Sequence, residues 1–206
     1  MSHRIVEEIR LENEWRTKDI AKMKMTYTQI PEENRSFFLR LCIPMIYAHW
    51  EGIVVTSLVT LIKYLNSLNL KQDEVPISIF VLSVGDKFKR LQSNQSFAQR
   101  CEFSTHFIER LQNSLNFETN ISTKSNLKFD VLTDICEAFI FDLNDFEEFK
   151  IDINRLVDIR NRIAHGENAY LLELPEMQKY FNLLEKLNDI FVNNIEKFLT
   201  EERYKI

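Results

Sequence analysis

The stretch Pro175–Arg203, PEMQKYFNLLEKLNDIFVNNIEKFLTEER, carries the pattern that decides the fold class. Large apolar side chains recur in it every three or four residues: Met177, Tyr180, Leu184, Leu187, Phe191, Ile195 and Phe198. This spacing follows the 3.6-residue turn of an α-helix and produces the single apolar stripe that a helix in a bundle buries. The sequence therefore predicts a long C-terminal helix packed against other helices.

The rest of the chain has the same helical period, and strict alternation never extends beyond a few residues. We expect further helices over residues 4–25, 34–68, 125–141 and 151–165, and two shorter ones between Pro76 and Asn116 that are separated near Ser93–Ser96. The helix over 34–68 is the most apolar and is expected to form the core, with a bend near Pro44 because proline has no amide proton to donate. The prediction is an all-α fold, an up-down helical bundle with peripheral helices.

We interpret residues 1–206 as one domain, because no linker, repeat or low-complexity tract divides them. Its core is expected over residues 35–200. Residues 1–30 have few core-type side chains and are expected to form an N-terminal helical extension that packs late or against a partner.

The composition excludes several classes of protein. The three glycines, Gly52, Gly85 and Gly166, lie too far apart to form a Walker loop or a dinucleotide-binding fingerprint. Three scattered cysteines fit neither a disulfide framework nor a zinc knuckle, so a reducing, cytoplasmic location is expected. The net charge of −5 argues against a broad nucleic-acid platform, and charged residues interrupt the apolar segment 37–65, so no membrane span is expected.

Two charged residues stand where apolar residues belong. When the helix over 151–165 is projected at about 100° per residue, Arg160 falls near the middle of an apolar arc. Glu51 has the same kind of position in the helix over 34–68. Because an unpaired charge removed from water costs several kcal/mol, each needs a partner. The simplest arrangement is that Glu51 and Arg160 face one another or meet at a subunit interface, and an internal ion pair that only fixes helix register is the alternative.

The segment Arg160-Asn161-Arg162-Ile163-Ala164-His165-Gly166 places an Arg and a His near the end of a helix. It resembles the signature of HEPN domains, helical domains whose ribonuclease members have four to six residues between these two. The string YAHWEG over residues 47–52 further resembles a prokaryotic HEPN-like nuclease branch with an early-helix Trp-Glu-Gly pattern. The resemblance covers residues from about 35 to 200. A second pair, Arg100 and His106, has a matching gap but lacks the flanking Asn and Gly, so we treat it as coincidental.

The resemblance implies a metal-independent endoribonuclease that cleaves RNA through 2′-OH attack and leaves a 2′,3′-cyclic phosphate. In this chemistry His165 is the general base or acid, Arg160 holds the phosphate oxygens, and Asn161 orients His165 or the phosphate. These three are the expected catalytic residues. Glu51 and Arg162 are expected to support the site.

Members of the family act as homodimers in which two motifs face a shared cleft, so a composite active site is expected. Two copies of Arg155 and Arg162 would then bind the RNA backbone and would compensate for the overall negative charge. A toxin or anti-phage effector of a bacterium, with a possible antitoxin or partner protein, is the implied biological role. Glu167 stands where toxins paired with a nucleotidyltransferase antitoxin have a modifiable Tyr, so that mode of control is not expected.

No metal and no cofactor are expected, because no two histidines share a helical i, i+3 or i, i+4 spacing. His49 is expected at the surface, and Cys42, Cys101 and Cys136 are expected as small core residues. The alternative function is a catalytically inactive helical dimer module that binds a nucleotide, RNA or protein partner. In that case Arg160 and His165 serve packing.

Overall fold

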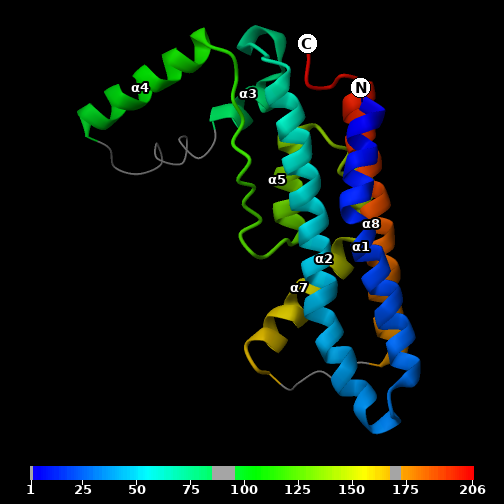
Figure 1. Ribbon diagram of the computed structural model, residues 1–206. Helices are drawn as coiled ribbons and strands as arrows, with labels where there is room; N and C mark the ends of the chain where they lie inside the picture. Colours follow the sequence, from blue (N-terminus) through cyan, green and yellow to red (C-terminus); the bar gives the residue numbers. More distant parts are fainter. Residues whose placement is uncertain (1, 85–95, 168–172) are drawn as a thin grey trace.

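The computed structural model describes residues 2–84, 96–167 and 173–206, and the regular structure within these ranges is helical throughout (Figure 1). The helices are α1 (Ser2–Gln29), α2 (Glu32–Ser67), the 3₁₀ turn η1 (Gln72–Glu74), α3 (Ile77–Val84), α4 (Phe97–Gln112), α5 (Phe129–Phe139), α6 (Asn144–Glu147), α7 (Lys150–Ala164) and α8 (Leu174–Thr200). The predicted all-α class is confirmed. Of the predicted break near Ser93–Ser96, residues 93–95 lie outside the described ranges.

The bundle is built around α2. Helices α1, α2 and α8 pack against one another in pairs, α7 packs against α2 and α8, and α5 contacts both α3 and α7. Helix α1 runs away from the end that holds both termini, and α2 and α8 run back towards it (Figure 1). At the centre, the fully buried Trp50 of α2 meets Phe191 of α8 edge to face, with ring centroids 6.2 Å apart. Such aromatic pairs bury large apolar areas and fix the distance between their helices.

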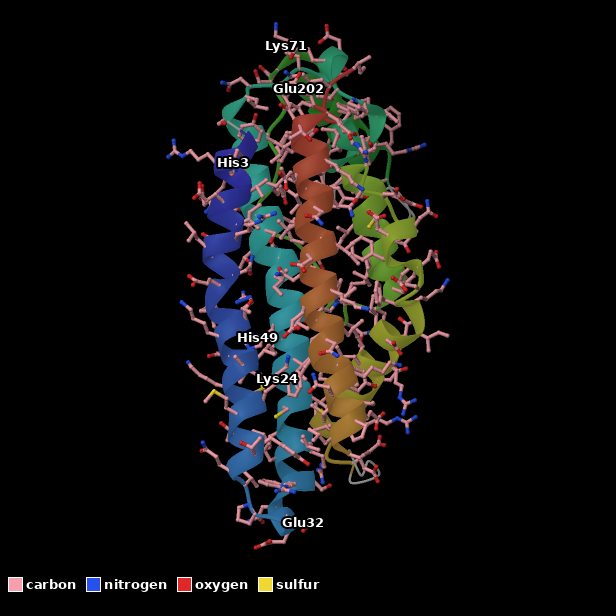
Figure 2. The ribbon with its side chains drawn as sticks, turned by 90° about the vertical axis from the view of Figure 1, so that its right-hand side faces the viewer. His3, Lys24, Glu32, His49, Lys71 and Glu202 are labelled. Atoms are coloured by element: carbon pink, nitrogen blue, oxygen red, sulfur yellow. The ribbon has the colours of Figure 1, made fainter. Side chains whose placement is uncertain are left out.

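Helix α1 belongs to the packed core although its sequence is rich in charge. Val6, Ile9 and Ile20 are buried on the side of α1 that faces α2 and α8. Figure 2 shows the three helices as neighbours from a second direction. Helix α1, which was expected to pack late or against a partner, packs against α2 and α8 of the same chain.

Helix α2 continues through Pro44 and has the length and apolar character to cross a membrane. However, 61% of its most apolar 18-residue stretch is buried inside the bundle. Burial against α1, α7 and α8 accounts for its apolar residues, as expected for the core helix of a globular domain.

The boundaries in the middle of the chain differ from those expected. Helix α5 begins at Phe129, whereas the sequence predicted a start near Ser125, because Lys124 and Ser125 have positive φ angles of 56° and 49° that interrupt a helix. The short elements η1 and α6 were not predicted. Helix α4 stands away from the bundle in Figure 1, and its Phe107 ring meets Phe80 of α3 at 5.8 Å.

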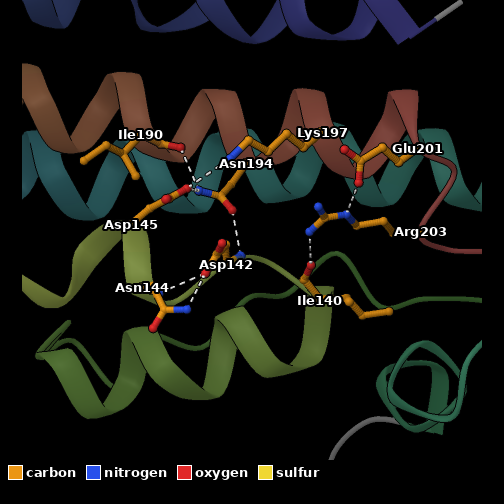
Figure 3. A network of polar contacts seen from close by, with 9 residues as sticks. All are labelled: Ile140, Asp142, Asn144, Asp145, Ile190, Asn194, Lys197, Glu201 and Arg203. Carbon is orange, nitrogen blue, oxygen red and sulfur yellow. Dashed lines mark hydrogen bonds and ion pairs between the residues drawn. The ribbon is translucent and has the colours of Figure 1, made fainter.

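A buried asparagine joins α8 to the turn between α5 and α6 (Figure 3). Asn194 Oδ1 accepts a hydrogen bond from the backbone N–H of Asp142 at 2.7 Å, and its Nδ2 donates to Asp145 Oδ2 at 3.1 Å. Beyond the C-terminal end of α8, Arg203 donates to the carbonyl of Ile140, which has a positive φ of 56° at the end of α5. Because both polar groups of the Asn194 amide are satisfied, its burial fixes the position of α8 at little cost.

Candidate active site

The motif helix α7 ends in a regular C-terminal cap. Gly166 has a φ of 82°; its N–H donates to the Ile163 carbonyl, and the N–H of Glu167 donates to the Arg162 carbonyl, both at 3.0 Å. These two bonds are those of a Schellman motif, which favours glycine at the residue with positive φ. His165 is the C-cap residue, and its exposed side chain makes no hydrogen bond to the described part of the chain. The predicted end of the helix at Gly166 is confirmed.

The guanidinium of Arg160 is half-buried and held from two sides. It lies over the ring of Tyr47 with its Cζ atom 3.7 Å from the ring centroid, and its Nη2 donates to the backbone carbonyl of Ser125 at 2.7 Å. Its Nε is buried without a partner, and Nη1 makes no hydrogen bond within the described residues. The stacking fixes the plane of the fork and leaves Nη1 as the donor that a phosphate could use.

Tyr47 and Glu51 form the support beneath this guanidinium. The Tyr47 hydroxyl donates to Glu51 Oε1 at 3.0 Å and accepts from the backbone N–H of Leu127 at 3.0 Å. Thr123 Oγ1 donates to the same carboxylate oxygen at 2.5 Å. Burial raises the pKa of Tyr47, the Leu127 hydrogen bond opposes that shift, and the Glu51 charge adds to it, so the phenol is neutral at pH 7.

The expected direct ion pair between Glu51 and Arg160 does not form within the described part of the chain, where no hydrogen bond or ion pair joins the two side chains. Tyr47 connects them, because its ring contacts Arg160 and its hydroxyl contacts Glu51. The projection onto separate helices correctly identified two inward charges. It could not identify Tyr47 as the link, because an apolar-face tyrosine has the pattern of an ordinary core residue.

The segment Thr123–Leu127 completes the site, and the sequence analysis missed it. Besides the contacts of Thr123, Ser125 and Leu127, the Oδ1 of Asn126 accepts a hydrogen bond from Asn161 Nδ2 at 3.0 Å. The positive φ angles at Lys124 and Ser125 are unfavourable for residues with a Cβ and persist only where neighbouring contacts enforce them. The Asn, Ser and Thr content of this stretch indicated a loop but not its contact with α7.

The two predicted RNA-binding arginines have different surroundings. Arg155 is exposed and forms a 2.6 Å ion pair with Glu176 of α8. Electrostatic interaction with Tyr180 raises the pKa of Arg155 most, and the Glu176 carboxylate adds to this shift. Arg162 is exposed and lies in the last turn of α7. Of the two, Arg162 is the one next to the motif's Asn161.

The prediction that His49 lies at the surface is wrong. Its side chain is 2% exposed, meets Trp15 edge to face at 5.3 Å between centroids, and has Nε2 4.0 Å from Asp19 Oδ2. The reason is α1, which covers this side of α2 and whose position cannot be read from α2 alone. Burial, followed by the Arg16 charge, lowers the pKa of His49, so its imidazole is neutral at pH 7.

The cysteine prediction is confirmed for Cys42 and Cys136 and wrong for Cys101, which is exposed on α4. Burial raises the pKa of Cys42 to about 11 and that of Cys136 to about 12, so both thiols stay protonated and unreactive. The coincidental pair Arg100 and His106 is exposed on α4, where Arg100 contacts the Phe97 ring and His106 contacts Glu109.

No group of three or more His, Cys, Asp or Glu residues with metal-binding geometry occurs among the described residues.

The family model described as RiboL-PSP-HEPN matches residues 11–197. No curated protein and no solved structure matches the chain.

Proposed function

Because the chain belongs to the RiboL-PSP-HEPN family, we propose that it is a metal-independent endoribonuclease that cleaves RNA through attack of a ribose 2′-hydroxyl. The observation that carries the proposal is the pair of side chains at the end of α7. Arg160 is stacked on Tyr47 with Nη1 unused within the described residues, and His165 is exposed with no hydrogen bond to them. A fixed cation and an accessible imidazole, both near the end of one helix, are the groups that this chemistry requires.

In the proposed reaction a His165 imidazole takes the proton of the 2′-hydroxyl as the 2′-oxygen forms a bond to phosphorus. Negative charge accumulates on the non-bridging phosphate oxygens, and the Arg160 guanidinium stabilises it through charge-assisted hydrogen bonds. The bond from phosphorus to the 5′-oxygen then breaks, and an acid protonates the leaving oxygen. The products are a 2′,3′-cyclic phosphate and a free 5′-hydroxyl.

The acid and the base act on opposite sides of the phosphorus, so one imidazole cannot serve both roles in a single step. We propose that a second copy of the chain supplies the acid as its own His165, in a homodimer with a composite site. Two Arg162 side chains would then face the RNA together, which would give local positive charge to a protein whose net charge is −5. Asn161, held by Asn126, would orient the phosphate or the imidazole.

Two contacts of Arg160 favour the alternative of a catalytically silent binding module. Arg160 already uses Nη2 on the Ser125 carbonyl and its ring-facing side on Tyr47, which is also what a purely structural arginine would do. In that module the same face would bind a nucleotide, RNA or protein without turnover.

The two functions predict different results when the purified chain is incubated with RNA in excess chelator. We expect the purified chain to cleave RNA with chelator present, and the Arg160→Ala and His165→Ala variants to lose about 10²- to 10⁴-fold in rate. Arg100→Ala and His106→Ala are matched controls, because they remove the same residue types from the exposed helix α4. A folded chain with no cleavage favours the module, and full cleavage by His165→Ala contradicts the site assignment.

A role as a cytoplasmic toxin or anti-phage effector follows from this activity as part of the proposal. Induced expression in a bacterial host should then arrest growth, and the His165→Ala variant should not. Equal growth arrest by the parent chain and by the His165→Ala variant would contradict a role based on cleavage.

A further inference from the structure

A small cavity of about 280 Å³ lies where α1, α2 and α8 meet, apart from the α7 site. Its lining includes Arg16 and Ile20 from α1, Ile53 from α2, and Leu184, Asn188 and Asp189 from α8. Pockets for drug-sized ligands measure about 300–1,000 Å³, so this one would fit a small metabolite. Three of these residues supply an apolar wall, and the other three are polar or charged.

Arg16 is the unusual member of this lining. Its side chain is 7% exposed, yet its Nε has no partner and its guanidinium makes no hydrogen bond to the described residues. It rests on the Trp15 ring with its Cζ atom 4.4 Å from the centroid. Glu12, the carboxylate that acts on it electrostatically, accepts a hydrogen bond from Thr60. A buried N–H donor such as Nε is costly without a hydrogen-bond acceptor, which indicates that an acceptor is missing.

Gly52 of α2 makes room for this guanidinium. A Cβ atom at Gly52 would lie 2.6 Å from Nη2 and 2.9 Å from Cζ of Arg16. Glycine within a helix costs about 1 kcal/mol relative to alanine. The glycine of the Trp-Glu-Gly string therefore has a defined structural role, which is to admit the Arg16 side chain at this point of the bundle.

The α8 side of the cavity offers acceptors that also lack partners. Asn188 Oδ1 is buried without a hydrogen bond, and Asp189 is exposed and forms no ion pair within the described ranges. Glu185, a further lining residue, is paired with Lys24 at 2.7 Å. The cavity thus has unpaired donors on α1, unpaired acceptors on α8 and aliphatic side chains between them. A doubly charged phosphate would be repelled by the carboxylates of α8.

We propose that this cavity binds a small aliphatic zwitterion of the α-amino acid class. The carboxylate of the ligand accepts hydrogen bonds from Arg16, and its ammonium group donates to Asn188 Oδ1 and Asp189. The aliphatic part of the ligand contacts Ile20, Ile53 and Leu184. Each group that the chain leaves unpaired in this cavity then has a complementary partner.

The test is binding by the full chain, measured by calorimetry and by the shift in melting temperature. L-leucine is the probe, 4-methylpentanoate lacks its ammonium group, 3-methylbutylamine lacks its carboxylate, and inorganic phosphate represents a simple oxyanion. We expect L-leucine to bind, each truncated analogue to bind at least about tenfold more weakly, and phosphate not to bind. Equal binding of phosphate and L-leucine, or no binding of any probe, overturns the proposal.

Arg16→Met tests the same site by another route. The variant should lose at least about tenfold in affinity for L-leucine, while its melting temperature without ligand is unchanged or higher because an unpaired buried charge is gone. Arg35→Met is the matched control, since Arg35 also stacks on an aromatic ring, that of Tyr27, but donates its Nε hydrogen bond to the Ile30 carbonyl. A marked fall in melting temperature for Arg16→Met together with unchanged L-leucine affinity shows a purely structural arginine and overturns the proposal.

Discussion

The support beneath Arg160 can be tested with the single change Tyr47→Phe. This substitution keeps the ring on which the guanidinium lies and removes only the hydroxyl, which accepts from the Leu127 N–H and donates to Glu51. The variant therefore separates two roles of one side chain. The ring positions Arg160, and the hydroxyl ties the Thr123–Leu127 segment to α2.

The expected loss of stability follows from the groups that remain after the hydroxyl is removed. The buried backbone N–H of Leu127 would be left without an acceptor, which costs about 1–3 kcal/mol. Glu51 would keep Thr123 as a donor but would lose one hydrogen bond to its carboxylate, which is worth about 1.5 kcal/mol in the same range of measurements. The free energy of unfolding should fall by about 2.5–4.5 kcal/mol in total.

Tyr64→Phe is the control for this experiment. The Tyr64 hydroxyl is buried and pairs with the Tyr204 hydroxyl at 3.3 Å, so its removal breaks one neutral bond and should cost about 0.5–1.5 kcal/mol. Urea unfolding of both variants measures the difference. A loss for Tyr47→Phe no larger than that for Tyr64→Phe would refute the reasoning, because the hydroxyl would then not hold the segment.

The activity of the same variants tests the role of the ring. Tyr47→Phe should cleave RNA within about threefold of the parent chain, since a cation over a Phe ring keeps most of its attraction. Tyr47→Leu should lose about 10- to 100-fold in kcat with little change in KM, because Arg160 loses the surface that orients it. Equal rates for Phe and Leu would contradict a positioning role for the ring.

Three further changes have outcomes set by the structure. Gly52→Ala should destabilise the chain despite the helical preference for alanine, because its Cβ meets the Arg16 guanidinium. In a chain that already carries Arg16→Ala, the same Gly52→Ala change should instead stabilise the fold by about 1 kcal/mol, as measured by urea unfolding of the two single variants and the double variant. Gly166→Ala should cost about 1–2 kcal/mol because φ is 82°, although its Cβ would meet no atom within 4 Å, and Gly166→Asn should cost less. Burial and the Arg16 charge lower the pKa of folded His49 below 6.5, so the unfolded chain binds a proton more readily. The free energy of unfolding should therefore fall as the pH drops below about 6.5. His49→Gln should remove this part of the pH dependence in unfolding curves recorded between about pH 5 and 7.

The sequence determined the features that depend on local spacing. The apolar period of residues 175–203 predicted α8, and Gly166 predicted the end of α7, because each is encoded within a few turns of one helix. The inward positions of Arg160 and Glu51 followed from the same projection. In each case the physical information lies in residues that are neighbours along the chain.

Only the tertiary structure decided which groups meet across helices. Tyr47 lies between Arg160 and Glu51, the segment Thr123–Leu127 closes over them, and α1 covers His49. A helical projection gives the direction of a side chain but not the identity of the element that packs opposite it. Those contacts depend on the packing of α1, α7 and the 123–127 segment around α2, and this packing is set by the fit of many side chains at once.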